Sequence, residues 1–152
     1  MALKFSTGLV DAIMTDKSFK EAAEGAAAGG FFIDIYTGVR PATPDDSATG
    51  TKLARFTAAA GAKMHFAAAS VGGVIAKAAA ESWAATGLAN GAAGYFRLVT
   101  DSDDGSTTST TAMRVDGTIA VSGSDMDMTS TAVALGAPLL INTATFTMPK
   151  SA

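Results

Sequence analysis

The clearest strand-like stretch lies between residues 95 and 100, where aromatic and β-branched side chains occupy both alternating sets of positions. A strand that is apolar on both faces is typical of the centre of a sheet covered on both sides. The Asp-, Ser- and Gly-rich segment 101–106 cannot continue the ladder, whereas 110–115 is again strand-like. The pattern therefore predicts a central hairpin between Gly94 and Gly117, with a loop longer than two residues.

Helical patterns are confined to the first thirty residues. Residues 6–16 carry an apolar stripe at helical spacing, with Ser6 placed to cap the first turn. Ser18 and Glu21 match a capping box in front of an Ala-rich run. We therefore expect a helical N-terminal segment over residues 1–30. It is either a lid that closes one end of the core or an arm that reaches a neighbouring subunit.

Short strand-like segments fill residues 31–152. In 31–37 the alternation places Phe31, Ile33 and Ile35 on the core face. Further strands are expected at 52–57, 64–66, 74–77, 81–83, 118–122, 125–129, 131–135 and 139–148, with a polar loop at 38–50 and a flexible connection at 87–94. About nine or ten short strands at this spacing predict a single-domain, all-β sandwich or barrel.

Composition narrows the classes of function. The 152 residues are 48% hydrophobic and only 16% charged, with a formal net charge of -3. So few charges suit a protein packed against copies of itself or against a larger surface. The acidic balance and the scattered Lys and Arg argue against nucleic-acid binding. We also expect no membrane span and no signal peptide, because apolar runs of the required length are absent.

Three aspartates before Gly105 invite a calcium-binding interpretation, because hard cations prefer several carboxylate oxygens. They are Asp101, Asp103 and Asp104. The spacing does not fit an EF-hand, since glycine comes fifth and Ala112 stands at the twelfth position. We interpret the segment as a solvated loop and assign no metal site. The same interpretation applies to two further carboxylate pairs, Asp45 with Asp46 and Asp125 with Asp127.

Single residues give no catalytic constellation. His65 is the one histidine, and the Gly-x-Ser-x-Gly elbow of a hydrolase is absent, so we expect a structural role and no enzyme activity. Trp83 is expected in the core, with a sugar- or partner-binding platform as the alternative. Glycine-rich phosphate loops are absent, so no cofactor is expected. Arg97 in an apolar strand needs a carboxylate, either Asp34 or Asp116 or one from another subunit.

Five segments carry a resemblance to a known family. They are Phe5-Ser-Thr-Gly-Leu-Val, Ile35-Tyr-Thr-Gly-Val-Arg-Pro-Ala-Thr-Pro-Asp-Asp, Thr49-Gly-Thr-Lys-Leu-Ala, Ala93-Gly-Tyr-Phe-Arg-Leu-Val-Thr and Arg114-Val-Asp-Gly-Thr-Ile. In this order they resemble small structural proteins encoded in tailed bacteriophage and prophage genomes. The resembling segments span nearly the whole chain.

The resemblance implies a capsid decoration, or cement, protein of jelly-roll-like β-sandwich type. Such a protein would lie on the capsid exterior as a homotrimer, bridge subunits of the major capsid protein, and be assembled in the host bacterial cytoplasm. It implies no catalytic, cofactor or metal residues. Two alternatives stay open: a tail or head-tail connector component, and a carbohydrate-binding jelly-roll module that uses Trp83 or Tyr95 as a stacking platform.

Overall fold

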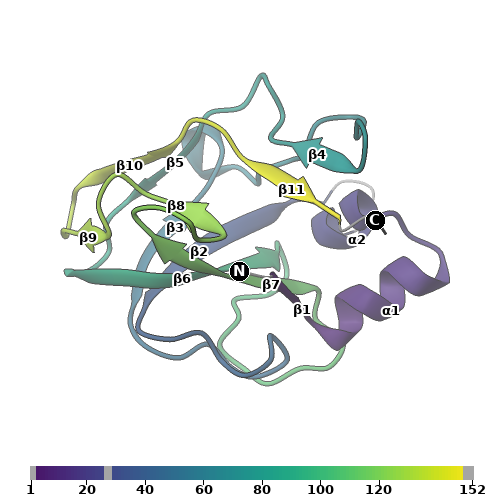
Figure 1. The fold of residues 1–152 in the computed structure, drawn as a ribbon, viewed down its shortest axis with the longest axis horizontal. Coiled ribbons are helices and arrows are strands. Elements are labelled where there is room, and N and C mark those ends of the chain that lie inside the picture. The colour runs from purple at the N-terminus through teal and green to yellow at the C-terminus, as the bar shows by residue number, and fades with distance from the viewer. Residues whose placement is uncertain (1–2, 26–28, 149–152) are drawn as a thin grey trace.

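A computed structural model describes residues 3–25 and 29–148 of the chain (Figure 1). Strands make up 38% of it and helices 13%, which confirms the predicted all-β class. All strand pairs among the described residues are antiparallel except that of β7 (Arg114–Ala120) with β8 (Met126–Asp127). The fold is therefore a β-sandwich-like arrangement with two short helices.

One large sheet forms the base of the fold. Its spatial order is β1 (Lys4–Phe5), β7, β6 (Gly91–Thr100), β2 (Phe31–Thr37) and β3 (Lys52–Phe56). Two short strands are added to this order, because β8 pairs with β7 and β9 (Ala132–Val133) pairs with β6. The central strand is β6, and it is buried without interruption from Tyr95 to Thr100. This confirms the prediction of a strand covered on both faces.

Two smaller strand pairs lie over one face of this sheet (Figure 1). They are β5 (Trp83–Thr86) with β10 (Pro138–Ile141), and β4 (Val74–Ala76) with β11 (Thr145–Thr147). The core fills the space between the two layers. Phe31 from the main sheet meets the Trp83 ring edge-on at 5.3 Å between centroids, and Phe66 meets Phe146 at 5.2 Å.

The N-terminal residues form the two expected helices, α1 (Thr7–Thr15) and α2 (Phe19–Glu24). Ser6 caps α1 by accepting a hydrogen bond from the Leu9 amide, and the predicted capping box begins α2. Leu9 is fully buried in the same core cluster as the strands. The strand β1, which the sequence pattern did not predict, pairs with β7 and so joins this segment to the main sheet.

Several strand boundaries differ from those expected. The connection 87–94 was predicted to be flexible, but β6 already begins at Gly91, because this part pairs with Thr37 of β2 and with β9. The segments 110–115 and 118–122 were expected as two strands. They overlap one continuous strand, β7, which begins only at Arg114 because the preceding residues form the loop.

Residues 139–148 were predicted as one long strand but form two, β10 and β11. The break lies at residues 142–144, where the chain passes from its pairing with β5 to its pairing with β4. Residues 64–66 make only isolated bridges, to Phe31 and Lys77. Only Trp83 of the predicted strand 81–83 lies in a strand of the structure. The strands predicted at 125–129 and 131–135 are shorter in the structure, where they form β8 and β9.

Candidate functional site

The main sheet carries a row of charges of alternating sign across the five strands β1, β7, β6, β2 and β3. In register from edge to edge the row is Lys4, Asp116, Arg97, Asp34 and Arg55. It lies on the face opposite the apolar core, because successive side chains of a strand point to opposite faces. The three central members are fully buried. We call these five residues the charge row.

Arg97 at the centre of the row is paired in the way expected for a buried guanidinium. Its Nε and Nη2 donate to the two carboxylate oxygens of Asp116 at 2.8 and 2.7 Å. Its Nη1 donates to the carbonyl oxygens of Asp46 at 2.8 Å and Gly105 at 3.1 Å. Burial disfavours the charge, but the bonds and charge of Asp116 outweigh it and raise the pKa of Arg97. Of the partners left open by the sequence, the structure pairs Arg97 with Asp116.

Asp34, the other expected partner, is held by β3. Arg55 donates to both of its carboxylate oxygens at 2.6 and 2.7 Å, and Lys52 Nζ lies 2.7 Å from Oδ2. These hydrogen bonds raise the pKa of Arg55. Burial, together with the nearby Asp34 charge, raises the pKa of Tyr36 as well. Asp34 therefore completes the row toward β3.

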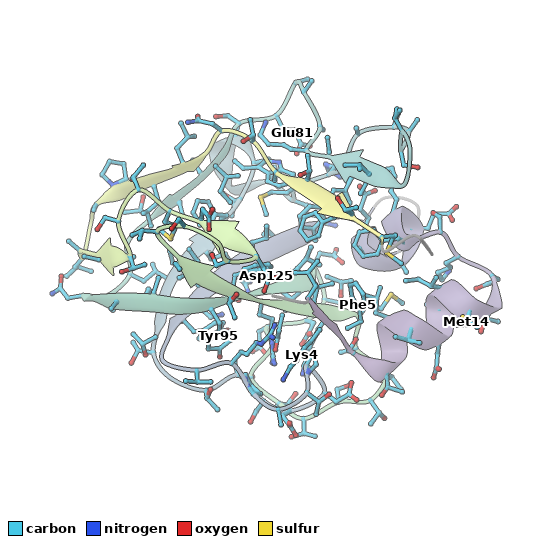
Figure 2. All side chains as sticks on the ribbon, in the orientation of Figure 1. Lys4, Phe5, Met14, Glu81, Tyr95 and Asp125 are labelled. Atoms are coloured by element: carbon cyan, nitrogen blue, oxygen red, sulfur yellow. The ribbon has the colours of Figure 1, made fainter. Side chains whose placement is uncertain are left out.

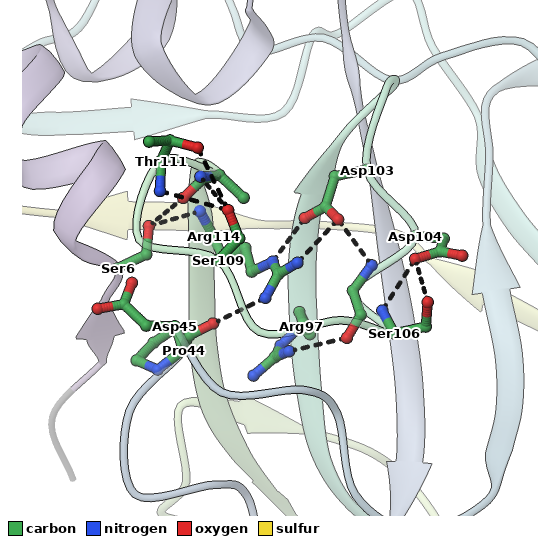
Figure 3. A network of polar contacts seen from close by, with 12 residues as sticks. Ser6, Pro44, Asp45, Arg97, Asp103, Asp104, Ser106, Ser109, Thr111 and Arg114 are labelled. Atoms are coloured by element: carbon green, nitrogen blue, oxygen red, sulfur yellow. Dashed lines mark hydrogen bonds and ion pairs between the residues drawn. The ribbon is translucent and has the colours of Figure 1, made fainter.

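A second buried arginine, Arg114, joins the loop 38–51 between β2 and β3 to the loop 101–113 between β6 and β7 (Figure 3). Its Nε and Nη2 donate to the Asp103 carboxylate at 2.6 and 2.9 Å, and its Nη1 donates to the Pro44 carbonyl at 3.2 Å. Burial would raise the pKa of Asp103, but the hydrogen bonds from Arg114 and the Gly105 amide hold it below its usual value. Asp103 is thus a structural anion in this loop.

The loop 38–51 is fixed to the polar face of the sheet from several directions. Tyr95 Oη donates to the Thr49 carbonyl at 2.7 Å and accepts from the Thr49 amide at 2.9 Å. Lys4 Nζ donates to the Ala42 carbonyl at 2.7 Å, and the Thr7 hydroxyl donates to the Asp45 carboxylate at 2.6 Å. Lys4 and Tyr95 point to the same side of the main sheet (Figure 2).

These contacts bring together residues from all five segments that carry the family resemblance. Ser6 accepts from the Arg114 amide at 2.9 Å and donates to the Ala112 carbonyl at 2.7 Å, which joins the first segment to the last. Every buried polar side-chain atom in the described parts of the chain has a partner. Chemically, the network pairs each fully buried charge with an opposite charge and holds the loops 38–51 and 101–113 together.

The remaining carboxylate candidates are each engaged locally. Asp101 pairs with Lys63 at 2.5 Å, and Asp104 accepts from the Ser106 hydroxyl at 2.6 Å. Asp125 accepts from Thr118 and Asp127 from Ser124. Within residues 3–25 and 29–148, no three His, Cys, Asp or Glu side chains gather closely enough to hold a metal ion.

His65 and Trp83 meet at one carboxylate, Glu81. The Trp83 indole donates to Glu81 Oε2 at 2.7 Å, and His65 Nδ1 lies 2.6 Å from Oε1. Burial opposes the charge, yet the hydrogen bonds from Trp83 and His65 lower the pKa of Glu81. Trp83 and Tyr95 are both fully buried, so neither forms the exposed stacking platform that the carbohydrate-binding alternative requires.

A cavity of about 760 Å³ lies between the main sheet and the C-terminal strands. Phe56 and Phe96 line it from the sheet, and Leu139 and Ile141 line it from β10. Asp125, Asp127 and Met128 line it from the segment around β8. This lining is mostly apolar and includes no arginine, lysine or histidine among the described residues. The cavity could hold apolar groups, and its two carboxylates each accept a hydrogen bond from a neighbouring hydroxyl.

Sequence reasoning missed Arg114, Ser6 and Glu81 as parts of these networks. The position of Arg114 could have indicated its role, because this charged residue lies in the strand-like segment 110–115, directly before the apolar Val115. Ser6 was recognised only as a helix cap, because its second role depends on the pairing of β1 with β7. No sequence pattern around Glu81 indicated that it would bind both His65 and Trp83.

Comparisons with protein-family models, with curated proteins and with solved structures each return no match. Neither helix in the described part of the chain is long and apolar enough to cross a membrane.

Proposed function

We propose that this chain is a structural protein of a tailed-phage virion, a capsid decoration protein that bridges subunits of the major capsid protein on the capsid exterior. The observation that carries the proposal is the convergence of the five resembling segments on one buried network. The residues that carry the resemblance make up the framework of the fold, since they include Arg97, Asp116 and Arg114.

The geometry also suits a mechanical role. The two loops over the charge row are fixed by buried ion pairs and backbone carbonyl contacts, so they would present a preformed surface to a partner. Many copies on a symmetric capsid repeat these contacts. The pressure of the packaged DNA inside the capsid would then have to break many contacts at once. In this proposal the chain acts through contact area, as a homotrimer, and catalyses no reaction.

Co-sedimentation tests the proposal directly. The purified chain is mixed with expanded, undecorated shells of the major capsid protein encoded in the same genome and, in parallel, with isolated tails. We expect saturable binding to shells at a fixed number of copies and no binding to tails. Binding to tails alone would favour a tail or head-tail connector component, and binding to neither would overturn the virion proposal.

A further inference from the structure

Charged residues are distributed very unevenly along this chain. The two longest stretches without Asp, Glu, Lys or Arg are 82–96 and 128–149. Strand pairing brings the two stretches together, because β5 pairs with β10 and the start of β6 pairs with β9. Figure 1 shows β5, β9, β10 and the start of β6 at one end of the molecule. We call residues 84–92 and 132–141 the uncharged surface.

Hydrogen bonds hold the connection between β5 and β6 beside the connection between β9 and β10. The Gly87 amide donates to the Ala137 carbonyl at 2.8 Å, and the Leu135 amide donates to the Asn90 side-chain oxygen at 2.9 Å. Two large apolar side chains project from these fixed connections, with Leu88 55% and Leu135 66% exposed. They are therefore presented to solvent by ordered backbone.

The strand β10 adds apolar area and an open edge. Leu140 in β10 is 57% exposed, and a hollow of about 780 Å³ beside it is lined by β5, β10, the turn 58–61 and, on its β3 side, by Arg55. Within the described residues β10 pairs with β5 alone, so its other edge has no strand partner. Natural edge strands are commonly protected by charges. The strand β10 carries no charged residue, although Pro138 stands at its start.

We propose that the uncharged surface joins this chain to a second copy of itself. Interfaces between identical subunits are more apolar than other interfaces, and their centres are depleted in charged residues. Selection of a foreign partner commonly uses complementary charges, which this surface lacks. A second copy would meet it without repulsion, although the whole chain carries a net charge of -3. The proposal rests on the proposed function only in sharing the expectation of self-association.

The test places a charge in the surface and measures the mass in solution. Leu135→Lys and Leu140→Lys are compared with wild type by sedimentation equilibrium over a wide concentration range. Each would place an unpaired charge in an apolar contact between copies, so we expect self-association to weaken at least about tenfold. The matched control is Met14→Lys on α1. Met14 is 80% exposed and lies far from the uncharged surface (Figure 2), so this variant should associate as wild type does.

Amide hydrogen exchange gives a second test that needs only the wild-type protein and so does not depend on the folding of the lysine variants. Amide exchange of wild type should slow at residues 84–92 and 132–141 as protein concentration rises, with no matching change in α1. A wild type that stays monomeric would overturn the proposal, and so would lysine variants that associate normally. Neither assay uses shells, so failure of shell binding leaves this result standing. A monomeric chain whose lysine variants lose shell binding would instead assign the surface to the capsid.

Discussion

Arg97 and Asp116 face each other directly across β6 and β7 and share two hydrogen bonds of 2.8 and 2.7 Å, with both side chains fully buried. The pair is the middle of the charge row, which alternates in sign from β1 to β3. A shift of register between strands would break the alternation, so the row favours one pairing of five strands over the others. Its role is thus specificity of the fold as well as stability.

Breaking this pair from one side is expected to be costly. Arg97→Met leaves a buried carboxylate without its partner, and Asp116→Leu leaves a buried guanidinium, so each should lower the free energy of unfolding by about 3–5 kcal/mol. The double variant should lose much less than the sum of the two. Urea unfolding of the four proteins measures the coupling. Additive losses would mean that the two residues act independently.

A matched control is available on the surface. The Lys63–Asp101 pair has side chains 39% and 31% exposed, so solvent screens it. Asp101→Asn should therefore change the free energy of unfolding by no more than about 1 kcal/mol. A loss as large as that of Asp116→Leu would show that the cost of breaking an ion pair in this protein does not depend on its burial.

Gly94 is required for close packing. A Cβ at this position would lie 1.9 Å from the backbone carbonyl oxygen of Gly38, which cannot move aside as a side chain could. Gly94→Ala should therefore destabilise the fold by about 1–3 kcal/mol or more, as overpacking does elsewhere. Ala92→Ser, at an exposed position of the same strand, is the control and should be nearly neutral in thermal unfolding.

Gly94 also illustrates what the sequence could and could not predict. Alternation identified the core face of β2, and the lone charge in an apolar strand identified Arg97 as a residue that needs a carboxylate, because both signals are local. The choice of Asp116 over Asp34 came only with the structure. The glycines at 87–94 suggested flexibility, whereas Gly94 is needed where the backbone of another segment passes. Likewise, the charge row became visible only with the register of five strands, which depends on loop lengths and bulges that no short pattern encodes.

Stability should fall in acid partly through Glu81. Its pKa is below the ordinary value of 4.5 in the folded protein, so the unfolded chain binds the proton more readily. The stability from Glu81 is then fully present above about pH 4.5 and is lost as the pH falls through the lower folded value. Glu81→Gln should show a flatter decline of the urea midpoint from about pH 6 to about pH 3. The exposed substitution Asp16→Asn is the control; identical slopes for wild type and Glu81→Gln would refute the assignment.

Two serines in this chain cap helices in different surroundings, which allows a comparison within one protein. Ser18 begins α2 at the surface, where water can replace its hydroxyl, so Ser18→Ala should cost about 1 kcal/mol. Ser6 begins α1 while fully buried, and its hydroxyl also accepts from the Arg114 amide and donates to the Ala112 carbonyl. Ser6→Ala leaves these groups unpaired away from water and should cost about 2–4 kcal/mol.

Amide exchange distinguishes the two roles of Ser6. Loss of a helix cap alone would speed exchange only at the start of α1, whereas loss of the buried junction should also speed it at Arg114, where β7 begins. Ser18→Ala should leave the Arg114 amide protected as in wild type. If both variants cost the same and Arg114 stays protected in each, Ser6 acts as a cap and the joining of β1 to the polar network depends on strand pairing alone.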